Sequence, residues 1–152
     1  MNLSLGYLFL NFDGRIPRLA WWVGIVCIMF PAFLISQLLV GLQAIDPAGG
    51  PPLLAGIISL FFVVPYVALT AKRFNDRGHN VGVSLFFVAI QIAAVVAQYF
   101  GWFVKPEEMG ETERMAFLVL LGYSLWVFVD NGFLPGTQGP NQYGPDPLDR
   151  AP

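Results

Sequence analysis

Long apolar segments separated by short polar ones dominate the hydropathy pattern of this chain. Three of the apolar segments cover residues 19–40, 53–71 and 81–104, and none of the three contains a charged residue. A helix needs about 20 apolar residues to cross the hydrocarbon of a bilayer. Each of these segments therefore predicts a membrane-spanning helix.

A fourth apolar segment, residues 115–129, is shorter than the other three. It reaches spanning length only if it continues to residue 131, which places Asp130 and Asn131 at one interface or requires the bilayer to thin locally. With it, the sequence predicts an all-α membrane protein whose four transmembrane helices, at about residues 19–40, 53–71, 81–104 and 115–131, form a bundle. We expect one domain over residues 1–152, ending in a Gly- and Pro-rich tail at 132–152.

Composition supports a bilayer as the solvent of this chain. Hydrophobic residues make up 56% of the sequence and charged residues only 12%, whereas about 25% of the residues in a soluble domain are charged. The remaining polar side chains are too few to cover a globule in water. A net charge of −2 offers no basic face, so nucleic acid is not expected as a partner.

The distribution of Lys and Arg predicts the orientation of the bundle. Six of the eight Lys and Arg residues belong to the N-terminal segment, the connection between the second and third spans, and the tail: Arg15, Arg18, Lys72, Arg73, Arg77 and Arg150. The other connections contain Lys105 and Arg114. Basic residues in short loops stay in the cytoplasm, so we expect both termini and the middle loop to be cytoplasmic.

Three polar motifs meet that predicted cytoplasmic face: FDGRIPR (12–18), KRFNDRGHN (72–80) and DNGFLPGTQGPNQYGPDP (130–147). Asp130 ends an apolar run, where an unpaired carboxylate would be costly, so we expect an arginine partner from Arg73, Arg77, Arg15 or Arg18. Asp13 and Asp76 would then use the remaining arginines. In the tail, Gly-Pro corners flank Tyr143, which predicts a loop folded onto the helix ends, with a flexible tail as the alternative.

The same residues allow two interpretations. One is a structural ion-pair network that holds the helix ends together. The other is a binding site, because the basic side chains outnumber the acidic ones there and could hold an anionic lipid headgroup or another phosphate. We expect no metal site, since the single His has no accompanying cysteine cluster, and no cofactor.

The three motifs, taken in order, resemble the "domain of unknown function 805" family of small bacterial inner-membrane proteins. FDGRIPRLAWW is similar to the opening element of the family, AKRFNDRGHNVG to its segment after the second span, and GTQGPNQYGPDP to its closing element. The resemblance covers nearly the whole chain and implies a location in the bacterial inner membrane. It marks Gly14, Arg15, Arg18, Arg73, Asp76, Gly78, Gly139, Asn141, Tyr143, Gly144 and Pro147.

This chain departs from the family pattern in the middle motif. Asn75 stands where the family usually has His, and Lys72 where it often has Arg. The loss of that His weakens any proposal of acid–base catalysis in the loop. The resemblance itself implies a fold and a location but no reaction.

We therefore expect a non-enzymatic assembly or accessory component whose cytoplasmic residues bind a partner subunit or an anionic phospholipid. The expected site consists of Asp13, Gly14, Arg15, Arg18, Arg73, Asn75, Asp76, Arg77, Gly78, Asp130, Asn141 and Tyr143. One alternative is an oligomeric transporter or channel for ions or small solutes, in which Gln91 and Gln98 share a helix face. A less favoured alternative is a lipid-modifying enzyme with Asp76 or Asp130 as base, because no nucleophile or metal set accompanies them. A homo-oligomer or a larger membrane complex would fit both the accessory component and the transporter.

Overall fold

The fold is all-helical over the residues that the computed structural model describes, which are 4–42, 53–99 and 109–149. Five helices follow one another along the chain: α1 (Leu5–Leu10), α2 (Arg18–Gly41), α3 (Leu53–Asp76), α4 (Val81–Tyr99) and α5 (Glu111–Gly132). The described residues form no strand, and one isolated bridge joins Asn141 to Gly144. The expectation of an all-α fold is confirmed for this part of the chain.

The four long helices occupy the four apolar segments, while the short α1 was not predicted. Ser4 caps α1, because its side-chain oxygen accepts a hydrogen bond from the Tyr7 amide. At the start of α5, the Gly110 amide donates to the Glu113 carboxylate, which lets the helix begin at Glu111, before the apolar run. The predicted third span extends beyond Tyr99, and its last residues lie outside the described residues, as do Lys105 and Arg150 of the orientation argument.

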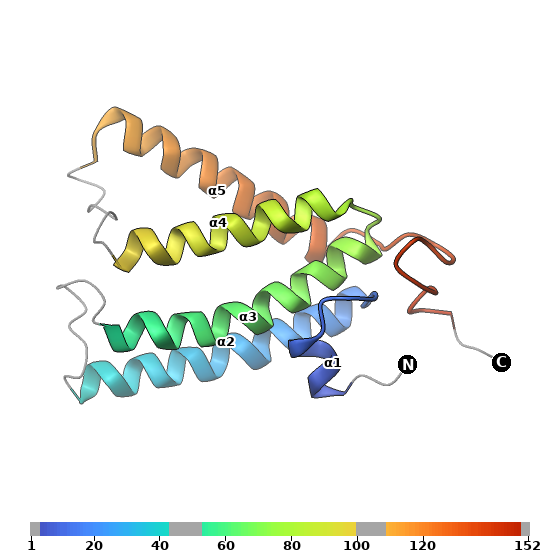
Figure 1. Cartoon of the computed structure of the whole chain (residues 1–152), viewed down its shortest axis with the longest axis horizontal. Coiled ribbons are helices and arrows are strands. Elements are labelled where there is room, and N and C mark those ends of the chain that lie inside the picture. The colour runs from blue at the N-terminus through green and yellow to red at the C-terminus, as the bar shows by residue number, and fades with distance from the viewer. Residues whose placement is uncertain (1–3, 43–52, 100–108, 150–152) are drawn as a thin grey trace.

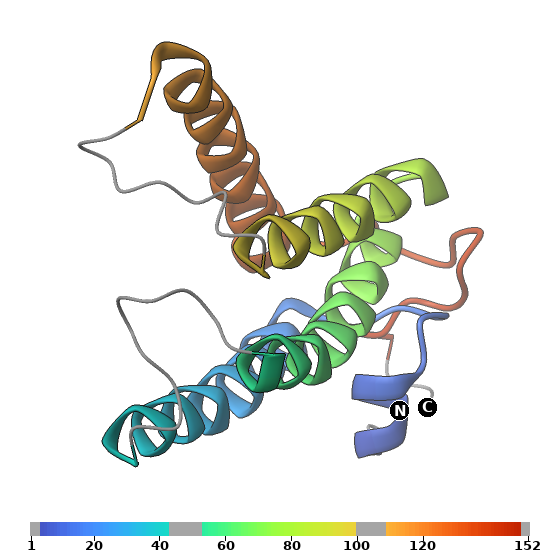
Figure 2. The ribbon, with the colours of Figure 1, turned by 60° about the vertical axis from the view of Figure 1, so that its left-hand side comes forward.

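Helix α3 is the centre of the arrangement, since it packs against α1, α2, α4 and α5. In Figures 1 and 2, α2 and α3 run side by side, and α5 diverges from them with distance from the end at which the tail lies. Helix α5 also packs against α2. The helices therefore meet most closely at one end of the molecule.

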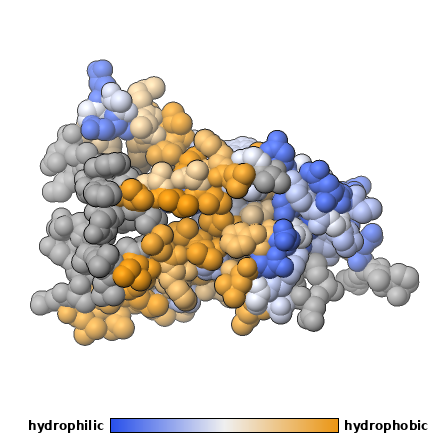
Figure 3. Space-filling view, in the orientation of Figure 1, coloured by the Kyte–Doolittle hydropathy of each residue, from blue (hydrophilic) through white to orange (hydrophobic). Residues whose placement is uncertain are grey.

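Besides a buried hydrophobic core, this molecule buries charged side chains and exposes many large apolar ones, a combination unusual for a water-soluble protein. The largest fully buried side chains include Arg73 and Lys72, whereas Val26 is 61% exposed and Val119 68% exposed. Figure 3 shows the same division, with a hydrophobic band over the helices and hydrophilic residues gathered at the end that carries the tail.

Within the described residues, two helices, α2 and α5, are long and apolar enough to cross a membrane, and a shorter apolar helical stretch covers Gly82–Ala93. Together with the exposed apolar side chains, these helices support association with a membrane. The crossing of the membrane by all four long helices, and the cytoplasmic placement of the termini, stay predictions.

Candidate functional site

The three polar motifs come together at the end of the molecule where the helices converge. We call this region the polar cap and define it as residues 11–18, 72–80 and 130–147. In Figure 1 it lies around the C-terminal end of α3, where the tail returns. The contacts within it show how each predicted site residue is used.

Asp76, the last residue of α3, holds two arginines from two different motifs. Its Oδ1 accepts a hydrogen bond from Nε of Arg15 at 3.0 Å, and its Oδ2 accepts one from Nη1 of Arg73. All three side chains are at most 3% exposed. Two guanidinium groups on one buried carboxylate form a compact ionic cluster, in which the arginines stabilise the ionised carboxylate.

The rest of the Arg15 guanidinium binds the tail. Nη1 donates to the carbonyl oxygens of Gly139 at 2.7 Å and Gly144 at 3.2 Å, and Nη2 donates to the carbonyl of Thr137 at 2.6 Å. Each N–H edge of this guanidinium therefore has a partner inside the protein. Arg15 organises the tail and has no free edge for an external anion.

Arg73 is used in the same way at the end of α5. Its Nε donates to the carbonyl of Asn131 at 2.8 Å, and its Nη2 donates to the carbonyl of Leu134. A helix leaves its last four carbonyl groups without intrahelical partners. Arg73 satisfies one of these orphan carbonyls and thereby joins α3 to α5.

The second buried carboxylate, Asp130, pairs with residues of the loop after α3. Its Oδ1 lies 3.3 Å from Nη2 of Arg77, and its Oδ2 lies 2.9 Å from Nε2 of His79. An arginine partner was expected, and Arg77 is the one that the fold supplies. Asp13 does not take a remaining arginine, because no ion pair within the described residues involves it; its backbone amide donates to the side chain of Asn11 instead.

Glycine makes the sharp end of α3 possible. The His79 amide donates to the Phe74 carbonyl and the Gly78 amide to the Asn75 carbonyl, with Gly78 at φ +74°. This pattern is a Schellman motif, whose left-handed residue is usually Gly because a Cβ is unfavourable there. The turn directs Arg77 and His79 toward Asp130.

Polar side chains of the tail fasten it to the rest of the polar cap. Asn141 donates from Nδ2 to the Asn75 carbonyl at 2.9 Å, and the Tyr143 hydroxyl donates to the His79 carbonyl at 2.6 Å. Asn75 in turn donates to the carbonyl of Gly14 at 3.1 Å. The residues 135–149 thus form an ordered loop on the helix ends, with Tyr143 in the anchoring position that the sequence predicted.

Asp146 stabilises the same loop through its backbone. Its carboxylate accepts hydrogen bonds from the amides of Gly139 and Leu148, each at 2.9 Å. These bonds, led by the one from Leu148, favour the charged form and lower the pKa of Asp146 below its ordinary value.

Sequence reasoning did not foresee the structural roles of Lys72 and Thr137. Lys72 is fully buried, and its Nζ donates to the carbonyls of Leu8 at 2.9 Å, Ala68 at 2.8 Å and Asn11, so that it ties α1 to α3. Thr137 donates from its amide and its hydroxyl to the carbonyl of Asp76. The available signals were a lysine next to an apolar span and a lone Thr among glycines, and neither specifies a carbonyl partner.

Arg18 differs from the other three motif arginines. Its Nη1 reaches the Phe133 carbonyl at 3.4 Å, the group is exposed, and no carboxylate pairs with it within the described residues. It borders a cavity of about 330 Å³ that also contacts Pro17, Pro135 and Leu148. Across residues 4–42, 53–99 and 109–149, no group of three His, Cys, Asp or Glu side chains is placed to hold a metal ion.

Comparison with known proteins places the three motifs within one family match. The family model described as "Protein of unknown function (DUF805)" matches residues 9–145, which include all three motifs. The chain is 29% identical over 143 residues to "Uncharacterized protein YiiR" of Escherichia coli strain K12, and equally to that of Escherichia coli O157:H7; the match covers 91% of this chain and 87% of the relative. No solved structure matches the chain. A family match over most of the chain, ending within the tail that Arg15 holds, shows that this protein belongs to the DUF805 family.

Proposed function

We propose that this protein is a non-enzymatic component of the bacterial inner membrane whose polar cap holds an anionic phospholipid headgroup beside Arg18. The observation that carries the proposal is the contrast between Arg18 and the other arginines of the cap. Arg15, Arg73 and Arg77 each pair with a carboxylate, whereas Arg18 has none within the described residues.

The position of Arg18 suits a phosphate group. It is the first residue of α2, and Pro17 at the N-cap offers no side-chain hydrogen bond to the first turn. The free amides of a first turn and the positive end of the helix dipole favour an anion at this point. Pro17, Pro135 and Leu148 give the adjacent cavity an apolar surface for the glycerol region of a lipid. Asp76 and Asp146 also line this cavity and repel an anion from its interior, so the proposed place for the phosphate is the exposed side of Arg18.

The predicted orientation places the polar cap beside anionic lipids. If the cap faces the cytoplasm, as six of the eight Lys and Arg residues predict, Arg18 lies at the anionic cytoplasmic leaflet. A headgroup would then bridge α2 and the tail. The proposed role is that of an accessory or assembly component whose polar cap is rigid and oriented by the lipid.

The bonding of the carboxylates supports the proposal of a non-enzymatic role. Asp76 is held by two arginines and Asp130 by Arg77 and His79. A general base needs a free carboxylate within hydrogen-bond reach of its substrate. Both candidate bases are occupied by cations of the protein itself.

Native mass spectrometry of the full chain with phosphatidylglycerol tests this proposal. We expect one retained phosphatidylglycerol and about fivefold weaker retention in Arg18→Gln, since a basic residue near an anionic surface contributes about 1 kcal/mol. Arg114→Gln is the matched control, because Arg114 is an exposed arginine at the other end of α5. Equal retention by both variants would contradict the headgroup site, and retention of a polypeptide that Arg18→Gln releases would show that the cap binds a subunit instead.

A further inference from the structure

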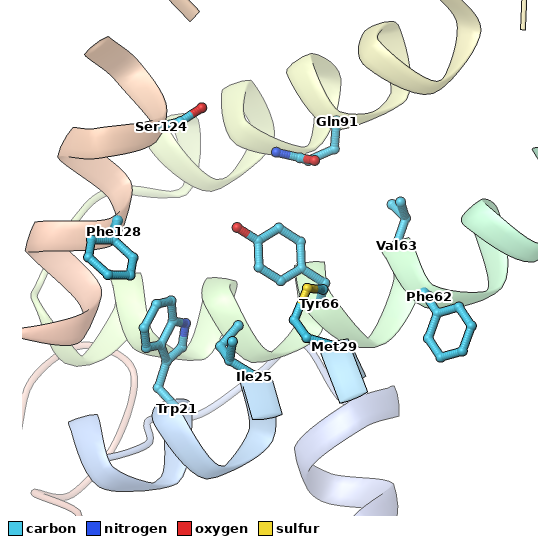
Figure 4. Close-up of a pocket in the computed structure, with 9 residues that line it drawn as sticks. All are labelled: Trp21, Ile25, Met29, Phe62, Val63, Tyr66, Gln91, Ser124 and Phe128. Carbon is cyan, nitrogen blue, oxygen red and sulfur yellow. The ribbon is translucent and has the colours of Figure 1, made fainter. Parts of the chain in front are cut away.

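A cleft of about 430 Å³ lies between the α2–α3 pair and helices α4 and α5, outside the polar cap. Most of its wall is apolar, with Trp21, Ile25 and Phe128 among the lining residues. Three polar side chains also line it: Tyr66 of α3, Gln91 of α4 and Ser124 of α5. Figure 4 shows the polar ends of these three side chains directed into the same space.

Two of these polar groups lack a partner. No hydrogen bond within the described residues involves the Tyr66 hydroxyl or the Gln91 amide, whereas the Ser124 hydroxyl donates to the Leu120 carbonyl at 2.8 Å. Polar groups of membrane helices are normally satisfied across a helix interface. The Tyr66 hydroxyl and the Gln91 amide are not among the buried unsatisfied groups, so both are accessible from the cleft and available as donors to a ligand in it.

The same helices carry two orphaned hydroxyls, although neither of these residues lines the cleft. The Ser84 and Tyr123 hydroxyls are buried and have no hydrogen-bond partner in the described part of the chain. Ser84 lies seven residues before Gln91 on one face of α4, and Tyr123 precedes Ser124 on α5. Tyr66 and Tyr123 also pack against the same buried cluster. Buried polar atoms without partners are rare in folded proteins, and each calls for an explanation such as a bound group.

The ligand should be neutral. Every residue that lines the cleft is uncharged. Tyr66 lies six residues from Lys72, and Ser124 lies six residues from Asp130, so both are about 9 Å along their helices from the charges of the cap. A charged group at that depth would be costly.

The size of the cleft fits a ring compound better than a helix. One turn of an α-helix with its side chains, about 11 Å across and 5.4 Å long, occupies about 500 Å³. The cleft, at about 430 Å³, is too small for a spanning helix but lies within the usual range of small-molecule sites, about 300–1,000 Å³. Trp21, Tyr66 and Phe128 offer aromatic surfaces to a flat ring.

We propose that this cleft binds the head group of a lipid-soluble quinone. One ring carbonyl accepts a hydrogen bond from the Tyr66 hydroxyl and the other accepts one from Nε2 of Gln91. The ring lies against the aromatic residues, and the apolar tail leaves through the open side of the cleft into the bilayer. This site is independent of the headgroup site at Arg18.

Quenching of tryptophan fluorescence by decylubiquinone, a benzoquinone with a decyl tail, tests the proposal on the full chain in detergent. We expect saturable quenching beyond that of a soluble tryptophan in the same micelles, because Trp21 lines the cleft. Tyr66→Phe and Gln91→Leu each remove one donor and should weaken binding about fivefold, the effect of about 1 kcal/mol per hydrogen bond.

A pair of matched variants separates the cleft from the lipid-facing surface. Val63→Phe narrows the cleft and should weaken binding at least as much, whereas Val26→Phe adds the same ring at an exposed position of α2 and should leave the affinity unchanged. Circular dichroism checks that each variant is folded. Arg18→Gln should also leave quinone affinity unchanged, so that the two proposed sites can fail separately.

Two results would overturn the quinone site. Quenching that does not saturate would mean that the probe only partitions into the micelle. Saturable binding that Tyr66→Phe, Gln91→Leu and Val63→Phe all leave unchanged would place the probe outside this cleft.

Discussion

The polar cap and the cleft differ in the charge and in the hydrogen bonding of their polar groups. In the cap, ionised side chains are buried and saturated: Asp76 holds two guanidinium groups, and the remaining N–H groups of Arg15 and Arg73 bind backbone carbonyls. In the cleft, the polar groups are neutral, and those of Tyr66 and Gln91 have no partner within the described residues. The two regions lie on the same helices, since α3 supplies both Asp76 and Tyr66.

This difference separates a structural role from a binding role. A buried ion with every partner in place fixes the geometry around it, and removal of one partner leaves an uncompensated charge. Replacing a neutral group that has no partner changes the stability of the protein little, and such a group is available to a ligand. Saturation therefore indicates a structural role for Asp76, Arg15 and Arg73, whereas groups with free donors, Arg18 in the cap and Tyr66 and Gln91 in the cleft, are the basis of the two proposed binding sites.

Among the variants that test this comparison, we expect Asp76→Asn to lower the stability of the protein the most. The change removes the carboxylate from two buried arginines, and breaking a buried ion pair costs about 3–5 kcal/mol. We expect a marked fall in the unfolding temperature in detergent, measured by differential scanning fluorimetry.

Asp13→Asn is the matched control for this change. Asp13 is exposed and forms no ion pair among the described residues, so we expect a change within about 0.5 kcal/mol. If both variants unfold at the temperature of the parent protein, the cap is not what stabilises the helix ends.

A smaller effect is expected from Asp130→Asn. The partners of Asp130 reach the surface, since the side chains of Arg77 and His79 are 22% and 26% exposed. Water can replace part of the lost interaction, so we expect a loss of about 2 kcal/mol, typical of a hydrogen bond to a charged group. Chemical denaturation of both variants side by side would measure the difference, and an equal loss for Asp76→Asn and Asp130→Asn would show that exposure of the partners does not matter.

The smallest expected effect is a pH dependence of the hydrogen bonds that Asp146 accepts in the tail. Hydrogen bonds from the Leu148 and Gly139 amides lower the pKa of Asp146 in the folded protein. Because the folded pKa is the lower one, the contribution is fully present above the unfolded pKa of about 3.9 and is lost as the pH falls through the folded value. We expect amide exchange protection at Gly139 and Leu148 to decline at acidic pH, below about 3.9.

Two variants check that assignment. Asp146→Asn should show reduced protection at these amides at every pH, whereas Asp149→Asn should behave as the parent protein, because its carboxylate makes no hydrogen bond in the described structure. Protection at Gly139 that stays constant from neutral to strongly acidic pH would show that the carboxylate of Asp146 does not hold the loop.

Several features of the fold and the site could be predicted before the tertiary structure was known. The apolar runs predicted the positions of α2 to α5, because a chain with so few charged residues is expected to fold its long apolar runs as helices. The depth of Asp130 required an arginine, and Arg77 is that partner. The short α1 was missed, since its apolar residues are few and its cap, Ser4, is a weak signal by itself.

The details of the site were not predictable from the residues in the same way. Several arginines were available to each carboxylate. Arg73 lies three residues before Asp76 on α3 and can reach it within the helix, whereas the choice of Arg15 depends on how the segment before α2 packs against the end of α3. Asp13, acidic and close in sequence to Arg15, stays unpaired among the described residues because the backbone directs it outward. Carbonyl groups have no sequence signature, so the bonds from Lys72 and Arg15 to them could not be foreseen.

From the sequence alone we could predict a membrane environment, the long helices and the residues of the cap, because hydropathy and charge are properties of each residue and its neighbours along the chain. Tertiary structure decided which arginines pair with a carboxylate, that Arg18 does not pair with one among the described residues, and that Tyr66, Gln91 and Ser124 share one cleft. The physical reason is that these outcomes depend on distances between helices, and such distances follow from how the helices pack: charged contacts join α3 and α5 at the cap, and α5 diverges from α2 and α3 beyond it (Figure 1).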